Sequence, residues 1–185
     1  MEMRTPALLI RPWRPDDVER LMELCNDPGV RARWGVFKEP MNFRQAGFWI
    51  SSANHSLAAC KLGSWAAFQG NLLVGCLNLV HRHLDNSQEL VPTLEVRLRQ
   101  GCPPPVALQG VQALIEYGRG LNLPEVYWFL TSEDSFLREL AGALGMAPVQ
   151  RAFFEKVAVD VYSLKLGAGV ETSAPTPGLS AVKKN

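Results

Sequence analysis

Hydrophobic residues follow two spacings along this 185-residue chain, and the two spacings alternate. From Val18 to Cys25 they recur every three to four positions, the spacing of an amphipathic helix. From Leu94 to Leu98 they alternate with charged residues, which is typical of a strand with one buried face. On this basis we predict strands at 7–11, 64–68, 72–80, 93–99 and 125–131, a strand pair within 151–166, and helices at 16–25, 43–54, 105–120 and 136–144.

The order of these elements predicts the fold class. Two apolar runs flank Gly70 and Asn71, a turn signal that indicates an antiparallel hairpin. A strand–helix–strand unit joins 93–99 to 125–131, and the other strands are expected to run antiparallel. We therefore expect one α+β domain over residues 1–166, with a mostly antiparallel central sheet flanked by helices. Residues 167–185 are small, polar and rich in proline, which predicts a disordered C-terminal tail.

Composition narrows the classes of partner. Hydrophobic residues make up 47% of the chain and charged residues 20%, and the formal net charge is only +1. Proteins that bind nucleic acid or an anionic membrane usually carry a basic excess, so we expect neither partner. No apolar run approaches the roughly 20 residues that span a bilayer. The four cysteines are scattered, without metal-ligand or redox spacing, which favours a reducing cytoplasm.

The most informative segment runs from Leu90 to Gly118 and reads as a strand, a tight loop and a helix. A helix N-terminus after a tight loop is a common place for a phosphate group, because its backbone amides are free and its dipole is positive there. The loop contains three consecutive prolines, 103–105, where a phosphate cradle usually has glycines. Proline has no amide hydrogen, so each one removes a possible donor.

Several local motifs, in this order, resemble the GNAT superfamily of N-acetyltransferases, and most closely the group of ribosomal-protein alanine N-acetyltransferases. The opening LLIRPWRPDDVERLMELCNDPGV resembles that group's first strand and helix, and WAAFQGNLLVGCLNL resembles its central hairpin. LEVRL is similar to the family's fourth strand, and VQALIEYG to the helix after its acetyl-CoA loop. LAGALGM and VDVYSLKL resemble the segments that close the domain. The resemblance covers about residues 7–166.

This resemblance implies acetyl-CoA, or another acyl-CoA, as co-substrate and no metal. In the family the fourth and fifth strands part, and the cofactor lies between them with its pyrophosphate on the loop and helix N-terminus. The family's loop pattern, Q/R-x-x-G-x-G/A, falls here on Cys102, Pro105 and Ala107, of which only Ala107 keeps it. The family's Asn, Ser and acidic Tyr after the fifth strand fall on Asp134, Leu137 and about Ala141. The implied cofactor-binding residues are Val96, Arg97, Leu98, Arg99, Gln100, Gly101, Cys102, Pro105, Val106, Ala107, Asp134 and Leu137.

Glu95 is the candidate general base. Acyl transfer from a thioester to an amine needs proximity, a base for the ammonium proton and donors for the carbonyl oxygen. Many members of the resembled family place a glutamate on the fourth strand near the acetyl group, and Glu95 matches that place. The alternative is a solvated carboxylate paired with Arg97 or Arg82.

Two further polar features have two interpretations each. His81 and His83 share one face of a strand, which suits a metal or a base, but no third ligand is evident and a polar loop histidine is the commoner explanation. Cys102 precedes a helix N-terminus, where a thiol pKa can be lowered and the thiol reactive. The alternative for Cys102 is an inert small residue.

The acceptor pocket is predicted from aromatic residues. In the resembled family the first 50 residues help to form it, and Trp34 and Phe37 in an irregular segment are the candidates here. Tyr162, with Asp160 beside it, is a third candidate on the last strand, although a plain edge strand explains both residues as well. For Phe48 and Trp49 we expect packing in the core.

Three hypotheses remain open from the sequence. The first is an acyl-CoA-dependent N-acyltransferase acting on a small amine or a peptide or protein N-terminus. The second is a catalytically silent module of the same fold that binds a partner or another ligand. The third keeps the fold and uses a longer or unusual acyl donor. The acceptor and the oligomeric state, including a homodimer, cannot be read from the chain.

Overall fold

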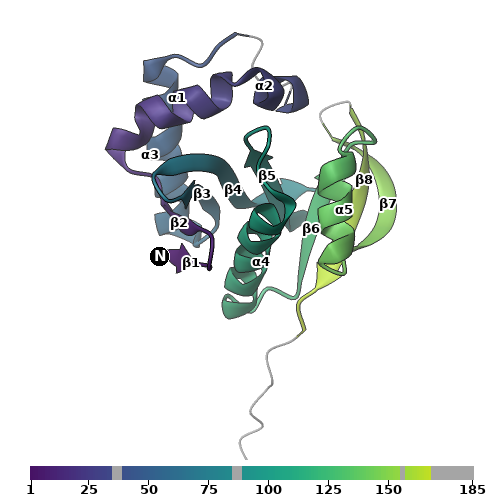
Figure 1. The fold of residues 1–185 in the computed structure, drawn as a ribbon. Coiled ribbons are helices and arrows are strands. Elements are labelled where there is room, and N and C mark those ends of the chain that lie inside the picture. The colour runs from purple at the N-terminus through teal and green to yellow at the C-terminus, as the bar shows by residue number, and fades with distance from the viewer. Residues whose placement is uncertain (35–38, 85–88, 155–156, 168–185) are drawn as a thin grey trace, which may run out of the picture.

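The central feature is one mixed sheet of eight strands, ordered β1-β2-β3-β4-β5-β6-β8-β7 (Figure 1). The computed structural model describes residues 1–34, 39–84, 89–154 and 157–167. The strands are β1 Met3–Arg4, β2 Leu9–Pro12, β3 Gly63–Gln69, β4 Leu72–His83, β5 Leu90–Leu98, β6 Glu125–Leu130, β7 Ala147–Phe154 and β8 Val157–Lys165. Among these described strands only β5 and β6 pair in parallel; all other pairs are antiparallel.

Helices cover both faces of the sheet. The short 3-10 helix η1 Pro15–Asp17 leads into α1 Val18–Asn26, followed by α2 Pro28–Trp34 and α3 Phe43–Cys60; later come α4 Pro104–Gly120 and α5 Ser135–Ala143. Figure 1 shows α1, α2 and α3 gathered together, apart from α4 and α5. Successive side chains of a strand point to opposite faces, so each strand contributes to two cores. On β4, Leu77 and Leu79 pack in the core under α4, whereas Cys76 packs in the core under α1 and α3.

Local signals in the sequence explain several boundaries. Asn42 caps α3 by accepting from the amide of Gln45, while the Gln45 side chain accepts from the Asn42 amide. At the other end Lys61 takes a left-handed conformation, φ 63°, and its amide closes the last turn on Leu57. Prolines 104 and 105 occupy the first positions of α4, where the backbone needs no donor.

A buried ion pair joins the first strand to the first helix. The Arg11 guanidinium donates to both carboxylate oxygens of Asp17, at 2.6 and 2.9 Å, and the Arg14 amide donates to the same group at 2.8 Å. Asp17 is fully buried. Burial alone would raise its pKa, but the hydrogen bonds from Arg11 and from the Arg14 backbone outweigh burial, and the pKa of Asp17 is lowered.

The structure confirms the predicted α+β class, the mostly antiparallel sheet and the β5–α4–β6 unit. It adds β1 and α2, which the pattern did not predict, and it starts β5 and β7 several residues earlier than predicted. The prediction for Phe48 was wrong: its side chain is 75% exposed, because it lies on the solvent side of α3. Trp49 is partly buried and meets Trp13 edge to face at 5.4 Å, as expected for core packing. The predicted tail lies, from residue 168, outside the described residues.

Candidate active site

β5 and β6 pair only briefly and then part. Their register contains two pairs, Thr93 with Tyr127 and Leu94 with Trp128. Beyond these pairs β5 continues to Leu98 on the support of β4, and β6 continues to Leu130 on the support of β8. The predicted divergence is therefore confirmed, and the β6-facing backbone of β5 after Leu94 has no strand partner.

Glu95 is the first residue of β5 beyond the last pair with β6. Its side chain is 20% exposed. Arg82 on β4 holds one carboxylate oxygen, Oε1, with Nε at 2.6 Å and a second nitrogen at 2.5 Å. The other oxygen, Oε2, has longer contacts, 3.3 Å to Asn78 Nδ2 and 3.5 Å to Arg97. Both arginines thus pair with Glu95, and Oε2 is the less tightly held oxygen.

The loop between β5 and α4 offers few amide donors. Prolines 103–105 have none, and the amides of Val106 and Ala107 both donate to the Pro103 carbonyl, at 2.9 and 3.0 Å. The Cys102 amide donates to Arg99, and the Arg99 amide donates to Val74. Of the backbone donors from 99 to 107, only those of Gln100 and Gly101 have no acceptor in the described part of the protein. Gly101 has φ +82°, a conformation that favours glycine.

A pocket of about 360 Å³ opens against this loop. It is lined by Arg99, Gln100, Gly101 and Cys102 from the loop, with Gly29 of α2 and Phe136 of α5 as its walls. Arg99 Nε is buried and has no hydrogen-bond partner among the described atoms, and one of its terminal nitrogens lies 3.4 Å from Glu23. The pocket therefore combines one cation with two free amides, which suits an anionic group.

After β6, the side chains of Asp134 and Leu137 make contacts within the fold. The Asp134 carboxylate accepts from both the amide and the hydroxyl of Thr131, at 3.2 and 2.8 Å. Leu137 packs against the core under α4 and α5. Neither side chain lines the loop pocket.

Two of the alternatives left open by the sequence can be judged from placement. Burial raises the pKa of the Cys102 thiol, which favours the interpretation as an inert small residue over that as a reactive thiol. Strand alternation puts His81 and His83 on the opposite face of β4 from Arg82, and so away from Glu95. Among the described residues, no group of three or more His, Cys, Asp or Glu side chains could hold a metal ion.

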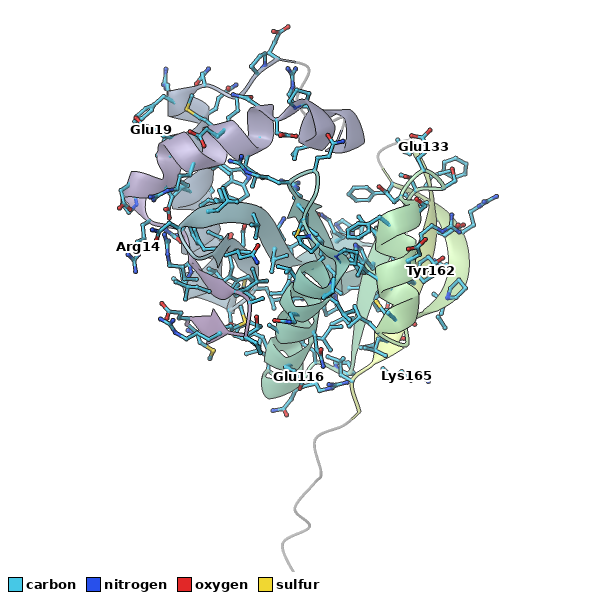
Figure 2. All side chains as sticks on the ribbon, in the orientation of Figure 1. Arg14, Glu19, Glu116, Glu133, Tyr162 and Lys165 are labelled. Carbon is cyan, nitrogen blue, oxygen red and sulfur yellow. The ribbon has the colours of Figure 1, made fainter. Side chains whose placement is uncertain are left out.

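The proposed acceptor residues do not gather around Glu95. Tyr162 packs in the core under α4 and α5, where it accepts from Arg138 Nε at 3.2 Å. Figure 2 labels it beside α5. Asp160 on the same strand pairs with Arg138 and Arg151. Phe37 lies outside the described residues, and only the backbone of Trp34 is described.

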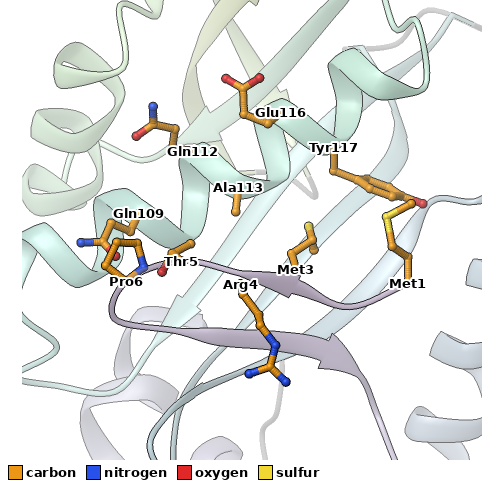
Figure 3. A pocket seen from close by; sticks show the side chains of 10 residues that line it. All are labelled: Met1, Met3, Arg4, Thr5, Pro6, Gln109, Gln112, Ala113, Glu116 and Tyr117. Atoms are coloured by element: carbon orange, nitrogen blue, oxygen red, sulfur yellow. The ribbon is translucent and has the colours of Figure 1, made fainter.

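A larger pocket, about 470 Å³, lies elsewhere (Figure 3). Met1 and Met3 of the N-terminal segment form one side of it, and Ala113 and Tyr117 of α4 form the other. No residue of β5 or β6 lines it, so its size does not mark it as the place of the chemistry. The parted strands remain the better marker.

Reasoning from sequence missed Asn78, Gly29 and Phe136. Asn78 is the one uncharged polar residue in the apolar run from Leu72 to Val80, and it is 3% exposed. A buried amide in such a strand needs partners, so its presence was an available signal. Gly29 and Phe136 reach the loop only through the packing of α2 and α5, for which the sequence has no local signal.

Comparison with known proteins agrees with this architecture. Residues 7–147 match the model of the acetyltransferase (GNAT) domain. No curated protein matches the sequence. A GNAT-family acetyltransferase of Bacillus anthracis superposes with a TM-score of 0.69 at 15% identity, covering 90% of this chain and 99% of that one. An Agrobacterium tumefaciens acetyltransferase gives 0.66 at 16% identity, covering 89% of this chain and 94% of that one.

A structure of a ribosomal L7/L12 alpha-N-protein acetyltransferase in complex with coenzyme A gives a TM-score of 0.70 at 12% identity. It covers 89% of this chain and 98% of that chain. Likeness at such identities concerns the fold, whereas the family model spans most of the chain itself. With its sheet parted beside a helix N-terminus and that match over residues 7–147, the protein belongs to the GNAT family of acetyltransferases.

Proposed function

We propose that this protein transfers an acyl group, acetyl in the simplest case, from an acyl-CoA directly to an amine. The acceptor would be a small molecule or a peptide or protein N-terminus. The observation that carries the proposal is the parting of β5 and β6 immediately before Glu95. An acyl-CoA arm entering between the strands would find free β5 backbone, and its thioester would reach the point where a carboxylate is placed.

The chemistry needs no covalent intermediate on the protein. Glu95 takes a proton from the acceptor ammonium, directly or through a water, and the neutral nitrogen attacks the thioester carbonyl. The carbon–nitrogen bond forms, the carbon–sulfur bond breaks, and the thiolate leaves. The second amine proton balances the charge on the departing thiolate. Ala141 stands about where the family has its acidic tyrosine, so this proton would pass through solvent.

The diphosphate would bind at the loop pocket through an unusual donor set. Helix amides normally hold such a group, but the first turn of α4 has none free. Arg99, the side chain of Gln100 and the amides of Gln100 and Gly101 would replace them. Val96, Arg97 and Leu98 would contact the pantetheine arm through their backbone, and α4 from Pro105 to Ala107 would contribute its dipole.

Calorimetry with acetyl-CoA, followed by a thiol-release assay with a panel of amines and peptides, tests the proposal. We expect saturable binding together with acylation of at least one acceptor. Absence of binding at millimolar acetyl-CoA would refute it. Arg99→Gln should weaken binding of acetyl-CoA about tenfold or more, because it removes the cation of the pocket. A matched change at an exposed arginine of β7, Arg151→Gln, should leave binding unchanged.

A silent module is the second candidate. It is favoured by the scarcity of free amides at the loop, where prolines 103–105 lack an amide hydrogen and the next two amides are already bonded. It is also favoured by the two arginines that pair with Glu95. Binding of acetyl-CoA without acylation of any amine would support it. An unusual acyl donor would appear as turnover with longer acyl-CoA esters only.

The proposed setting is the cytoplasm. All four cysteines are free thiols, which suits a reducing compartment. No helix among the described residues is long and apolar enough to cross a membrane. Measurement of the solution mass would show whether the protein works as a homodimer.

A further inference from the structure

A continuous chain of hydrogen bonds crosses three strands and ends on Glu95. Trp13 Nε1 donates to Ser64 Oγ at 3.1 Å, and Ser64 Oγ lies 3.1 Å from Cys76 Sγ. Cys76 Sγ donates to Asn78 Oδ1 at 3.1 Å, and Asn78 Nδ2 donates to Glu95 Oε2 at 3.3 Å. The four residues before Glu95 are each 5% exposed or less. None of this chain is part of the loop pocket.

The direction of the chain follows from its two ends. An indole N–H can only donate, and an ionised carboxylate can only accept. Burial raises the pKa of the Cys76 thiol to about 11, so the thiol keeps its proton at neutral pH. Since that proton goes to Asn78 Oδ1, the Ser64 hydroxyl must donate to the sulfur. Every link then donates toward Glu95, and the Asn78 amide has a single orientation that satisfies both its neighbours.

This orientation matters because the two oxygens of Glu95 are held differently. Arg82 holds Oε1 at 2.5–2.6 Å and fixes one side of the carboxylate. Oε2 has only longer contacts, of which the one to Asn78 Nδ2 at 3.3 Å is shorter than the one to Arg97 at 3.5 Å. We propose that Asn78 is the positioning residue for Glu95, turning Oε2 toward the opening between β5 and β6, and that Trp13, Ser64 and Cys76 set the direction of the Asn78 amide. The inference rests on the proposed function, in which Glu95 is the base.

The first test replaces Asn78. Asn78→Leu keeps the size but removes the donor, and we expect kcat to fall about 10- to 100-fold while KM for the acyl-CoA changes about twofold or less. Asn78→Asp puts a second carboxylate against Glu95, and two close carboxylates hold a shared proton to higher pH. Because the base must be ionised, the acid limb of the pH–rate profile should move up by about one pH unit or more. A variant that lost only packing would not combine a lower kcat with a nearly constant KM, and it would not shift the acid limb of the pH–rate profile.

The pH readout can be assigned because few charges face Glu95. Among the described residues these are Arg82 on β4 and Arg97 on β5, together with the titratable thiol of Cys76 on β4. Burial raises the pKa of the Cys76 thiol to about 11, well above the acid limb.

A matched pair of cysteines tests the rest of the chain. Cys25 and Cys76 are buried in the same apolar cluster, but only Cys76 belongs to the chain. Cys76→Ala should lower kcat about threefold or more, whereas Cys25→Ala should leave it within about twofold. Cys76→Ser retains a donor and should recover most of the lost kcat. If Cys76→Ala, Cys76→Ser and Cys25→Ala all kept the kcat of the wild type, Cys76 would have no part in orienting the Asn78 amide.

Failure of this inference can be told apart from failure of the proposed function. If the wild type acylates an amine but Asn78→Leu and Asn78→Asp keep its kcat and pH profile, the positioning role is refuted and the transferase remains. If the wild type acylates nothing, crystal structures of the wild type and Asn78→Leu decide the positioning role. We expect the Glu95 carboxylate to rotate away in the variant. An unchanged carboxylate would overturn the inference.

Discussion

Restoring an amide to the first turn of α4 should tighten binding of acetyl-CoA. Pro105 is the second residue of α4, a position whose amide has no partner inside a helix and is free to donate outward. The loop now has two unpartnered amides, at Gln100 and Gly101, so Pro105→Ala would raise the number to three. We therefore expect a gain in affinity from a substitution at a conspicuous proline.

The magnitude can be worked from the bond that would form. A hydrogen bond to a charged oxygen contributes about 1.5–3 kcal/mol net, and partial exposure at the loop brings this to about 1–2 kcal/mol. That corresponds to a Kd about 5- to 30-fold lower. The same change costs about 0.4–1 kcal/mol of folding stability, because the unfolded chain gains conformational freedom when proline is removed.

Calorimetry with two ligands checks the reasoning. Acetyl-CoA carries the diphosphate, whereas S-acetylpantetheine has the same thioester arm without it, so only acetyl-CoA should bind Pro105→Ala more tightly. Pro148→Ala, at an exposed proline of β7, is the matched control and should change neither affinity. An unchanged Kd for acetyl-CoA, or an equal gain for both ligands, would refute a diphosphate site at this helix end.

Three further outcomes are expected. Glu95→Gln should lower kcat by about 10²- to 10⁴-fold with an unchanged calorimetric Kd for acetyl-CoA, since it removes only the proton acceptor; normal turnover would withdraw its role as base. Asp17→Asn should cost about 3–5 kcal/mol in urea unfolding at pH 7, because it leaves the buried charge of Arg11 without its partner. The pKa of Asp17 is lowered in the folded state, so its contribution to stability is present above about pH 4 and is lost as the pH falls through the folded pKa. Acid unfolding of the wild type, compared with that of Asp17→Asn, would measure this loss. Gly75→Val should abolish acetyl-CoA binding, because a Cβ there would lie 2.6 Å from the Arg97 carbonyl and push β5 off β4; a folded variant that binds normally would contradict this.

The sequence by itself determined the local elements. Side chains alternate across a strand and recur every 3.6 residues on a helix, so the run from Leu94 to Leu98 and the stripe from Val18 to Cys25 could be assigned from spacing alone. The scarcity of amides at the loop was also readable, because prolines 103–105 lack a donor in any fold. Phe48 shows the limit of prediction from spacing, because a hydrophobic residue in a helix can face either the core or the solvent.

Only the tertiary structure decided where the strands part and what surrounds Glu95. The last pair, Leu94 with Trp128, joins two strands that α4 separates along the chain, and no local spacing encodes that contact. The meeting of Asn78 with Glu95 likewise depends on the register between β4 and β5. Register is a property of two strands distant in sequence, and packing of both faces sets it, so a one-residue slip would turn either side chain to the opposite face of the sheet.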